Sequence, residues 1–283
     1  MSKSEQPRLA VRKMYKLFIN GAFVRSESGR SDPISDGKDF VANIARGSRK
    51  DVRDAVVAAR AAQAKWWKTA PGTRGLVLYR LAEMMEARRA ELIDLTGDET
   101  EVTAAIDRVV WYAGWCDKYA ALLSTRNPVG GPHFNFSTAE PMGVVGMLAP
   151  DEPSLLGIVS VLMPALVAGN SVVLVASETN PRTAIVFSEC LATSDIPAGV
   201  VNVISGTRSE LAPVIAKHMD VNAIAFVDGA QTADLQTAAA ENVKRTRVLP
   251  ARSARDWFSP AAQSLDDVAA YSEIKTIWHP AGI

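Results

Sequence analysis

Two cysteines are the side chains of this sequence best suited to covalent chemistry. A thiolate is a strong nucleophile, but it forms at neutral pH only where a nearby positive charge lowers the pKa of a partly exposed thiol. Cys116 lies in WYAGWCDKYA and Cys190 lies in VFSECLATSD, and both segments belong to predicted helices that contribute to the core. We therefore interpret both cysteines as structural and predict no catalytic residue in the chain.

The three histidines, His133, His218 and His279, are the other residues that could bind a metal or move a proton. A zinc site requires histidine and cysteine ligands at short, regular spacing. The sequence contains no such cluster, and no carboxylate or cysteine accompanies these histidines at metal spacing. We expect no metal site, and we interpret His133 and His279 as packing or surface residues.

Charge and polarity exclude two further classes of function. The 283 residues include 31 Lys and Arg and 31 Asp and Glu, so the formal net charge is zero. A nucleic-acid partner is not expected, because such binders carry a basic excess. The uncharged stretch between Glu152 and Glu178 is interrupted by Pro164, which favours a buried helix, a turn and a strand over a membrane span. Residues 1–16 lack the apolar core of a secretory signal, and we expect a cytoplasmic protein with no membrane partner.

The first part of the chain, residues 1–123, predicts a hairpin followed by helices. Asn20–Gly21 separates two apolar runs within residues 16–25, which is the pattern of a tight β-hairpin. Ser48 precedes Asp51 by three residues, a capping-box spacing that begins a helix. The apolar spacing then predicts a second helix from about residue 73 to Leu95, with Gly97 after its end, and a third over 101–123.

The middle of the chain predicts an α/β fold. Residues 124–142 are rich in Pro, Gly, Ser and Thr and indicate an extended arm. Over residues 143–249 apolar runs such as SVVLVA alternate with helical segments, which is typical of a doubly wound parallel sheet with helices on both faces. We expect strands at 143–149, 171–176, 200–204, 223–227 and 245–249, and helices at 154–168, 181–194, 208–218 and 230–243.

The end of the chain changes character again. Residues 250–267 contain two prolines and several charges, and we interpret them as a linker. Residues 268–283 contain the segment YSEIKTIWHPAGI, in which Ile274, Thr276 and Trp278 lie on one face of a predicted strand. Such an apolar edge strand requires another sheet edge to pair with. We expect residues 271–283 to dock on another chain.

Several segments together resemble the aldehyde dehydrogenase superfamily, in order and over nearly the whole chain. The resemblance implies a Rossmann-like coenzyme domain that binds NAD or NADP, together with an oligomerisation arm near 124–142 and a C-terminal oligomerisation strand. The segments that carry it are KLFINGAFV, DVRDAVVAARAAQAKWWK, EPMGVVGMLAP, LVAGNSVVLVASETNP, DIPAGVVNVISG, MDVNAIAF and KTIWHP.

The sequence departs from the family where the family performs its chemistry. The family nucleophile is a cysteine of a catalytic domain that follows the coenzyme domain, whereas this chain passes from Leu249 through a short segment to the C-terminal strand. Leu249 and Pro250 stand near the place of the family's general-base glutamate. Asp151 and Glu152 stand where the family has an oxyanion-binding asparagine, and a carboxylate would repel a developing oxyanion. The resemblance therefore implies a member without its own catalytic residues.

The coenzyme-binding residues are partly retained. In the run VASE, Val175 replaces the lysine that contacts the adenosine ribose in the family. Asp228 replaces a residue of the turn that faces the pyrophosphate, although a simpler role for Asp228 is to cap helix 230–243. We therefore expect NAD or NADP to bind at most weakly and no resident cofactor. The residues that remain as vestigial coenzyme contacts are Ser177, Glu178, Gly206 and Gly229.

Three functional hypotheses follow from this combination of retained and lost features. The first is a catalytically inactive subunit that assembles with a full-length aldehyde dehydrogenase paralogue or with further copies of itself. The second is an NAD(P)-dependent oxidoreductase that acts on aldehydes through a changed site. The third is a coenzyme-domain remnant that binds another nucleotide.

Overall fold

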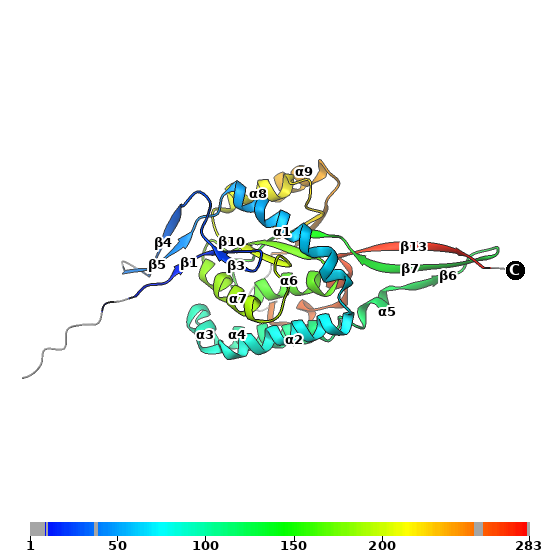
Figure 1. The fold of residues 1–283 in the computed structure, drawn as a ribbon, viewed down its shortest axis with the longest axis horizontal. Coiled ribbons are helices and arrows are strands. Elements are labelled where there is room, and N and C mark those ends of the chain that lie inside the picture. The colour runs from blue at the N-terminus through cyan, green and yellow to red at the C-terminus, as the bar shows by residue number, and fades with distance from the viewer. Residues whose placement is uncertain (1–8, 10, 37–38, 252–256, 282–283) are drawn as a thin grey trace, which may run out of the picture.

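A seven-stranded sheet lies at the centre of the molecule, in the order β12-β11-β8-β9-β10-β2-β3 (Figure 1). The computed structural model describes residues 9, 11–36, 39–251 and 257–281. Five strands are parallel, as their continuous apolar runs predict, and together with the helices they confirm the doubly wound, Rossmann-like fold. They are β8 (Val144–Leu148), β9 (Ser171–Val175), β10 (Val201–Ile204), β11 (Ala223–Val227) and β12 (Arg245–Leu249).

The predicted hairpin extends this sheet at the β10 edge. Strands β2 (Leu17–Ile19) and β3 (Ala22–Val24) pair antiparallel around Asn20 and Gly21. Both turn residues have positive φ, 53° and 74°, a conformation that asparagine and glycine tolerate best. The local sequence therefore determines this turn.

Helices cover both faces of the sheet. On one face lie α1 (Arg49–Lys68), α8 (Arg208–Lys217) and α9 (Thr232–Ala240). The opposite face is covered by α6 (Leu156–Val167), all of whose residues are buried, and by α7 (Pro181–Thr193). An outer layer packs over α6 and α7 and consists of α2 (Pro71–Ala87), α3 (Arg89–Thr96) and α4 (Glu99–Ala113).

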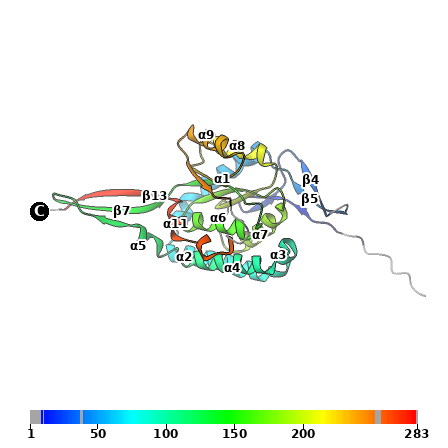
Figure 2. The ribbon, with the colours of Figure 1, turned by 180° about the vertical axis from the view of Figure 1, so that it is seen from behind.

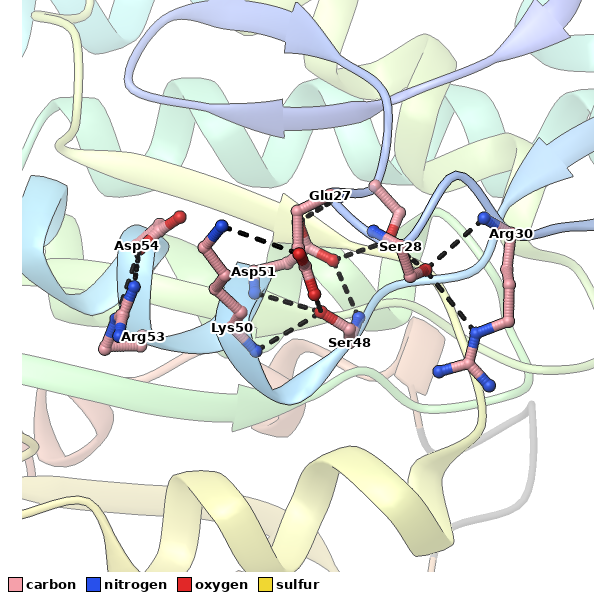
Figure 3. Close-up of polar contacts among 9 residues, drawn as sticks. Glu27, Ser28, Arg30, Ser48, Lys50, Asp51, Arg53 and Asp54 are labelled. Atoms are coloured by element: carbon pink, nitrogen blue, oxygen red, sulfur yellow. Dashed lines mark hydrogen bonds and ion pairs between the residues drawn. The ribbon is translucent and has the colours of Figure 1, made fainter.

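Helix α1 begins as the sequence predicts. The Ser48 side chain accepts hydrogen bonds from the backbone N–H groups of Lys50 and Asp51, and the Asp51 carboxylate accepts from Ser48 N at 2.8 Å (Figure 3). This is a complete capping box, which satisfies amides that a helix start leaves without an intrahelical partner.

Two predicted helices are each divided in two. The helix expected from residue 73 to Leu95 breaks at Arg88 into α2 and α3, and both pieces pack on α7 and α4. The helix expected over 101–123 ends at Ala113, and a separate helix α5 (Tyr119–Leu123) leads to the arm. The apolar spacing runs across both breaks, so the expectation of continuous helices was wrong. The break at Arg88 lets α3 pack against α7, a tertiary contact that local periodicity does not encode.

A small three-stranded sheet was not predicted. It consists of β1 (Met14–Tyr15), β5 (Asp39–Ala45) and β4 (Ser31–Asp36), in that order. Strand β4 contains a proline and is largely exposed, so it lacks the apolar alternation by which a half-buried strand is recognised.

The arm is a second three-stranded sheet, which we call the arm sheet, in the order β13-β7-β6. It consists of β6 (Thr125–Asn127), β7 (His133–Pro141) and β13 (Ser272–Pro280). It projects from the body, and the chain reaches its far end at the C-terminus (Figures 1 and 2). Strand β13 pairs antiparallel with β7 over its whole length, from Ser272–Pro141 to Pro280–His133. One edge of this strand is therefore paired within the molecule, and docking of the strand on another chain stays a prediction.

The predicted linker, residues 250–267, is folded over most of its described part; residues 252–256 lie outside the described residues. It contains a 3-10 turn (Pro260–Ala262) and the start of helix α11 (Leu265–Ala269). The Trp257 side chain is buried, and its carbonyl oxygen accepts a hydrogen bond from Arg108 at 2.7 Å. The described part of this segment therefore packs against α4 through Arg108 and against α6 through α11, and α11 leads directly to β13 of the arm sheet.

Candidate functional site

The carboxyl ends of β8 and β11 border a cleft of about 450 Å³, which we call the coenzyme cleft. The chain leaves β8 toward α6 on one face and leaves β11 toward α9 on the other, so these neighbouring strands mark the point where the winding direction changes. In doubly wound folds this is the position where ligands bind. The cleft is lined by residues 148–152, residues 226–232, Arg208, Leu235 and Trp257.

The lining of the coenzyme cleft is acidic. Asp151, Glu152 and Asp228 contribute carboxylates, and Arg208 is the cation among the lining residues that the structure describes. Arg208 forms a two-pronged ion pair with Asp151, with both N–O distances at 3.1 Å, and also donates to the Ala149 carbonyl oxygen. The positive charge of Arg208 is therefore already neutralised, and the cleft retains an excess of negative charge.

The turn after β11 is closed by its own side chains. Gly229 N donates to Thr232 Oγ1 at 2.9 Å, and Thr232 Oγ1 donates to Asp228 Oδ1 at 2.7 Å. Asp228 N donates to the Leu249 carbonyl oxygen at 2.8 Å. The amides of Asp228 and Gly229 are thus engaged inside the protein. The expectation that Asp228 caps the helix was wrong, since α9 begins at Thr232 and Asp228 binds that residue's hydroxyl instead.

Three of the four predicted coenzyme contacts line a second, smaller cavity of about 270 Å³. Ser177, Glu178 and Gly206 meet there at the carboxyl ends of β9 and β10, next to β4 and β5. Gly229 lies apart from them, in the coenzyme cleft. The structure therefore places the four predicted residues in two adjacent hollows.

Each of these three residues already has a structural role. The Glu178 carboxylate accepts a hydrogen bond from Arg208 N at the start of α8. The Ser177 hydroxyl donates to Asp151 at 2.7 Å. Gly206 has a φ of 146°, and a Cβ there would lie 3.1 Å from the Gly47 backbone nitrogen, so close packing explains this glycine without a ligand.

Arg208 and Asp151 are the site residues that sequence reasoning missed as a pair. Asp151 binds Ser177 of the smaller cavity and Arg208 of the coenzyme cleft, so the pair lies between the two hollows. A signal was present, because Arg208 is a lone cation in GTRSEL, directly after β10, where the carboxyl ends of the parallel strands meet.

The start of α6, a few residues after the Asp151 and Glu152 positions that the resemblance aligns with the oxyanion site, is occupied by a carboxylate. Glu101 of α4 is buried and accepts hydrogen bonds from the backbone N–H groups of Leu155 at 2.6 Å and Leu156 at 3.1 Å. Burial raises the pKa of Glu101 from its ordinary value. These two amides therefore donate to a protein carboxylate.

Both cysteines are buried, free and distant in sequence from the cleft-lining loops. Burial raises the pKa of each thiol to about 12. Cys116 follows α4, and Cys190 of α7 directs its sulfur toward the Met84 carbonyl oxygen at 3.7 Å. Neither residue lines the coenzyme cleft, and neither forms a thiolate at neutral pH.

Within the described ranges, no group of histidine, cysteine, aspartate and glutamate residues is arranged to hold a metal ion. None of the helices in that part of the chain is both long and apolar enough to cross a bilayer.

A model of the aldehyde dehydrogenase family matches residues 23–249. The chain belongs to this family. It is 33% identical over 245 residues to the mitochondrial benzaldehyde dehydrogenase of Antirrhinum majus, a match that covers 81% of the chain and 45% of the relative. It is 31% identical over 255 residues to an aldehyde dehydrogenase of Emericella nidulans, with 85% and 51% covered. The chain thus spans about half the length of the curated relatives it matches.

Solved structures of the aldehyde dehydrogenase family share this fold. An NAD⁺ complex of aldehyde dehydrogenase from Bacillus cereus superposes with a TM-score of 0.79 at 26% identity, covering 84% of this chain and 51% of that one. A point mutant of betaine aldehyde dehydrogenase from Staphylococcus aureus, also in complex with NAD⁺, gives 0.77 at 26% identity, with 83% and 49% covered.

The residues of this aldehyde dehydrogenase family member do not fit a dinucleotide well. The pyrophosphate of NAD would enter a cleft in which Asp151 and Arg208 neutralise each other and the carboxylates of Glu152 and Asp228 leave a net negative charge. Val175, at the position of the ribose-binding lysine, is completely buried in the sheet. The carboxylate of Glu178, which the resemblance implies as a ribose contact, accepts a hydrogen bond from the backbone N–H of Arg208 at the start of α8.

Proposed function

We propose that this chain is a catalytically inactive aldehyde dehydrogenase family subunit that assembles with a full-length aldehyde dehydrogenase through the arm sheet. The observation that carries the proposal is the open outer edge of β13. Its inner edge pairs with β7, whereas within the described residues its outer edge pairs with no strand. Ile274 and Trp278 on this strand are more than half exposed.

The exposed strand supports an assembly role for physical reasons. An open edge presents unpaired backbone donors and acceptors that can pair with a strand of a second chain. Large apolar side chains beside such an edge gain free energy when a partner removes them from water. The arm sheet also projects beyond the body, so a partner can reach it without displacing the sheet and helices of the core.

The proposed lack of catalytic activity is inferred from the residues at and near the coenzyme cleft. The described residues place no thiolate beside it, Glu101 occupies the amides at the start of α6, and Leu249 ends β12 where the family carries its base. We further propose that NAD or NADP binds at most weakly, because the coenzyme phosphates would enter a cleft in which the carboxylates of Glu152 and Asp228 are not offset by a free cation among the described residues. A carboxylate about 4 Å from a phosphate charge costs roughly 1 kcal/mol in water and roughly 4 at an effective dielectric near 20.

The fold similarity to NAD⁺ complexes favours one competing function, an oxidoreductase with a changed site. The two functions are distinguished by co-expression of this chain with a full-length aldehyde dehydrogenase of the same organism. We expect a defined heteromer by size-exclusion chromatography with light scattering, and no aldehyde oxidation by the isolated chain with NAD or NADP.

Two results would contradict the proposal. A stable monomer that does not bind the full-length enzyme would rule out the subunit role. Turnover of an aldehyde by the isolated chain would rule out inactivity and favour the oxidoreductase.

A further inference from the structure

A further hollow, separate from the coenzyme cleft and from the smaller cavity that Ser177 lines, lies between α1, α8 and the chain segment that follows β3. We call it the basic hollow. Its volume is about 870 Å³, the size of sites that hold small organic molecules, which range from about 300 to 1,000 Å³. It is lined by Glu27, Arg30, Ser48, Arg49, Lys50, Arg53, Pro213, Val214, Lys217 and His218.

The charge of this lining differs from that of the molecule as a whole. Five of its residues are Lys or Arg, and Glu27 is the one carboxylate among them. The chain itself has a formal net charge of zero. Positive charge is therefore concentrated in the hollow, where like charges repel one another and attract anions.

Only part of this positive charge is neutralised. Lys50 pairs with Glu27 at 3.5 Å, and Arg53 pairs with Asp54 outside the hollow at 3.2 Å (Figure 3). Arg30 donates to the Ser28 hydroxyl and lies on the other side of Ser48 from these two pairs.

Three cations of the lining keep their charge unpaired. Arg30, Arg49 and Lys217 form no ion pair with any residue that the structure describes. They come from three different segments: the loop before β4, the first residue of α1 and the last residue of α8. An anion in the hollow would therefore be surrounded by cationic side chains from three segments of the chain.

The remaining lining adds a hydrogen-bond donor and an apolar surface. His218 Nδ1 accepts from Asp220 N at 3.2 Å, which leaves Nε2 as the protonated nitrogen of the neutral ring. Burial lowers the pKa of His218, so the neutral ring prevails at neutral pH. Pro213 and Val214 supply apolar contacts for the carbon atoms of a ligand.

We propose that the basic hollow binds a small organic molecule that carries two or more phosphate groups. Arginine side chains bind phosphate oxygens through paired N–H donors, and a phosphate group carries more negative charge than a carboxylate. A single phosphate would fill only a small part of the hollow. Ser48 already occupies the amides of Lys50 and Asp51, so side chains, not the end of α1, hold the ligand.

The test is a calorimetric titration of the full chain with ATP and, separately, with inorganic pyrophosphate at low ionic strength. We expect both to bind, ATP more tightly because of its apolar base, and both to weaken as salt screens the charges. The variant with Arg49→Gln and Lys217→Gln removes two unpaired cations. It should weaken ATP binding roughly thirty-fold, since each charge near the surface contributes about five- to sixfold.

Two controls locate the site. The variant with Lys65→Gln and Lys68→Gln also removes two cations, from the last turn of α1, and should bind ATP like the unaltered chain. The variant Arg208→Gln changes the coenzyme cleft and should leave ATP binding intact. Circular dichroism and thermal unfolding show that each variant is folded.

Three results would overturn the proposal. The first is the absence of binding of either probe at millimolar concentration. The second is an equal loss in the variant with Lys65→Gln and Lys68→Gln, which would indicate unspecific attraction. The third is a loss in Arg208→Gln together with unchanged binding in the variant with Arg49→Gln and Lys217→Gln, which would place the ligand in the coenzyme cleft.

Discussion

Replacement of Trp278 by aspartate tests the assembly role of the arm sheet. The side chain lies on β13, packs edge-on against His133 with ring centroids 5.9 Å apart, and is 60% exposed. An aromatic side chain buries roughly 150–250 Å² in a complete core, so about 90–150 Å² of Trp278 still faces water. At about 25 cal/mol per Å², a partner that covers this area gains about 2–4 kcal/mol from Trp278 alone.

This gain sets the size of the expected effect. Loss of about 2–4 kcal/mol weakens the complex with a full-length aldehyde dehydrogenase roughly 30- to 700-fold, and a buried aspartate adds a desolvation cost. The dissociation constant is measured by biolayer interferometry on the immobilised full-length partner. The α/β body should keep its thermal unfolding temperature, because Trp278 lies on the projecting arm and outside the core.

A matched control separates this effect from a general effect of a new surface charge. Val57 on α1 is also 60% exposed and lies on the body of the molecule, so Val57→Asp should change the dissociation constant by less than about threefold. Binding of Trp278→Asp as tight as that of the unaltered chain would contradict the assembly role of the arm sheet. Weakening of the complex by Val57→Asp to the same extent would contradict it as well.

Three further predictions concern the body of the molecule. Asp228→Asn removes one carboxylate from the coenzyme cleft and should tighten NAD binding about fivefold by calorimetry, since one exposed charge near a phosphate costs about 1 kcal/mol; unchanged affinity would exclude Asp228 as a cause of weak binding. Steady-state assays over a panel of aldehydes should show no turnover for the unaltered chain, and activity that disappears in Cys116→Ala or Cys190→Ala would show that a buried thiol is catalytic. Burial raises the pKa of Glu101, so the folded state binds its proton more tightly and the free energy of unfolding falls as pH rises from the unfolded value of about 4.3 through the raised pKa. Glu101→Gln should remove this part of the pH dependence in denaturant titrations, and an identical pH profile for both proteins would contradict the assignment.

The positions of the parallel strands were predictable because each strand is marked by a short run of apolar residues within its own segment. SVVLVA and GVVNVI are apolar apart from Ser171 and Asn202, which is typical of strands covered on both faces, and the structure places β9 and β10 there. The hairpin at Asn20–Gly21 and the capping box of Ser48 depend on residues within a few positions of one another. Local steric and hydrogen-bond preferences determine such features.

The candidate site was only partly predictable. The sequence pointed to Ser177, Glu178, Gly206 and Gly229, and the structure divides them between two hollows. It did not show that Arg208 pairs with Asp151, because that contact joins loops that follow different strands. Only the order of the strands in the sheet brings these loops together.

By itself the sequence determined the fold class and the parallel strands, since both depend on which residues occupy consecutive positions. The tertiary structure decided that the helix breaks at Arg88 between α2 and α3, that β13 pairs with β7 of the same chain, and that Glu101 occupies the start of α6. These features join segments that lie far apart in the chain, and their free energy comes from surfaces buried and hydrogen bonds formed only after the chain has folded.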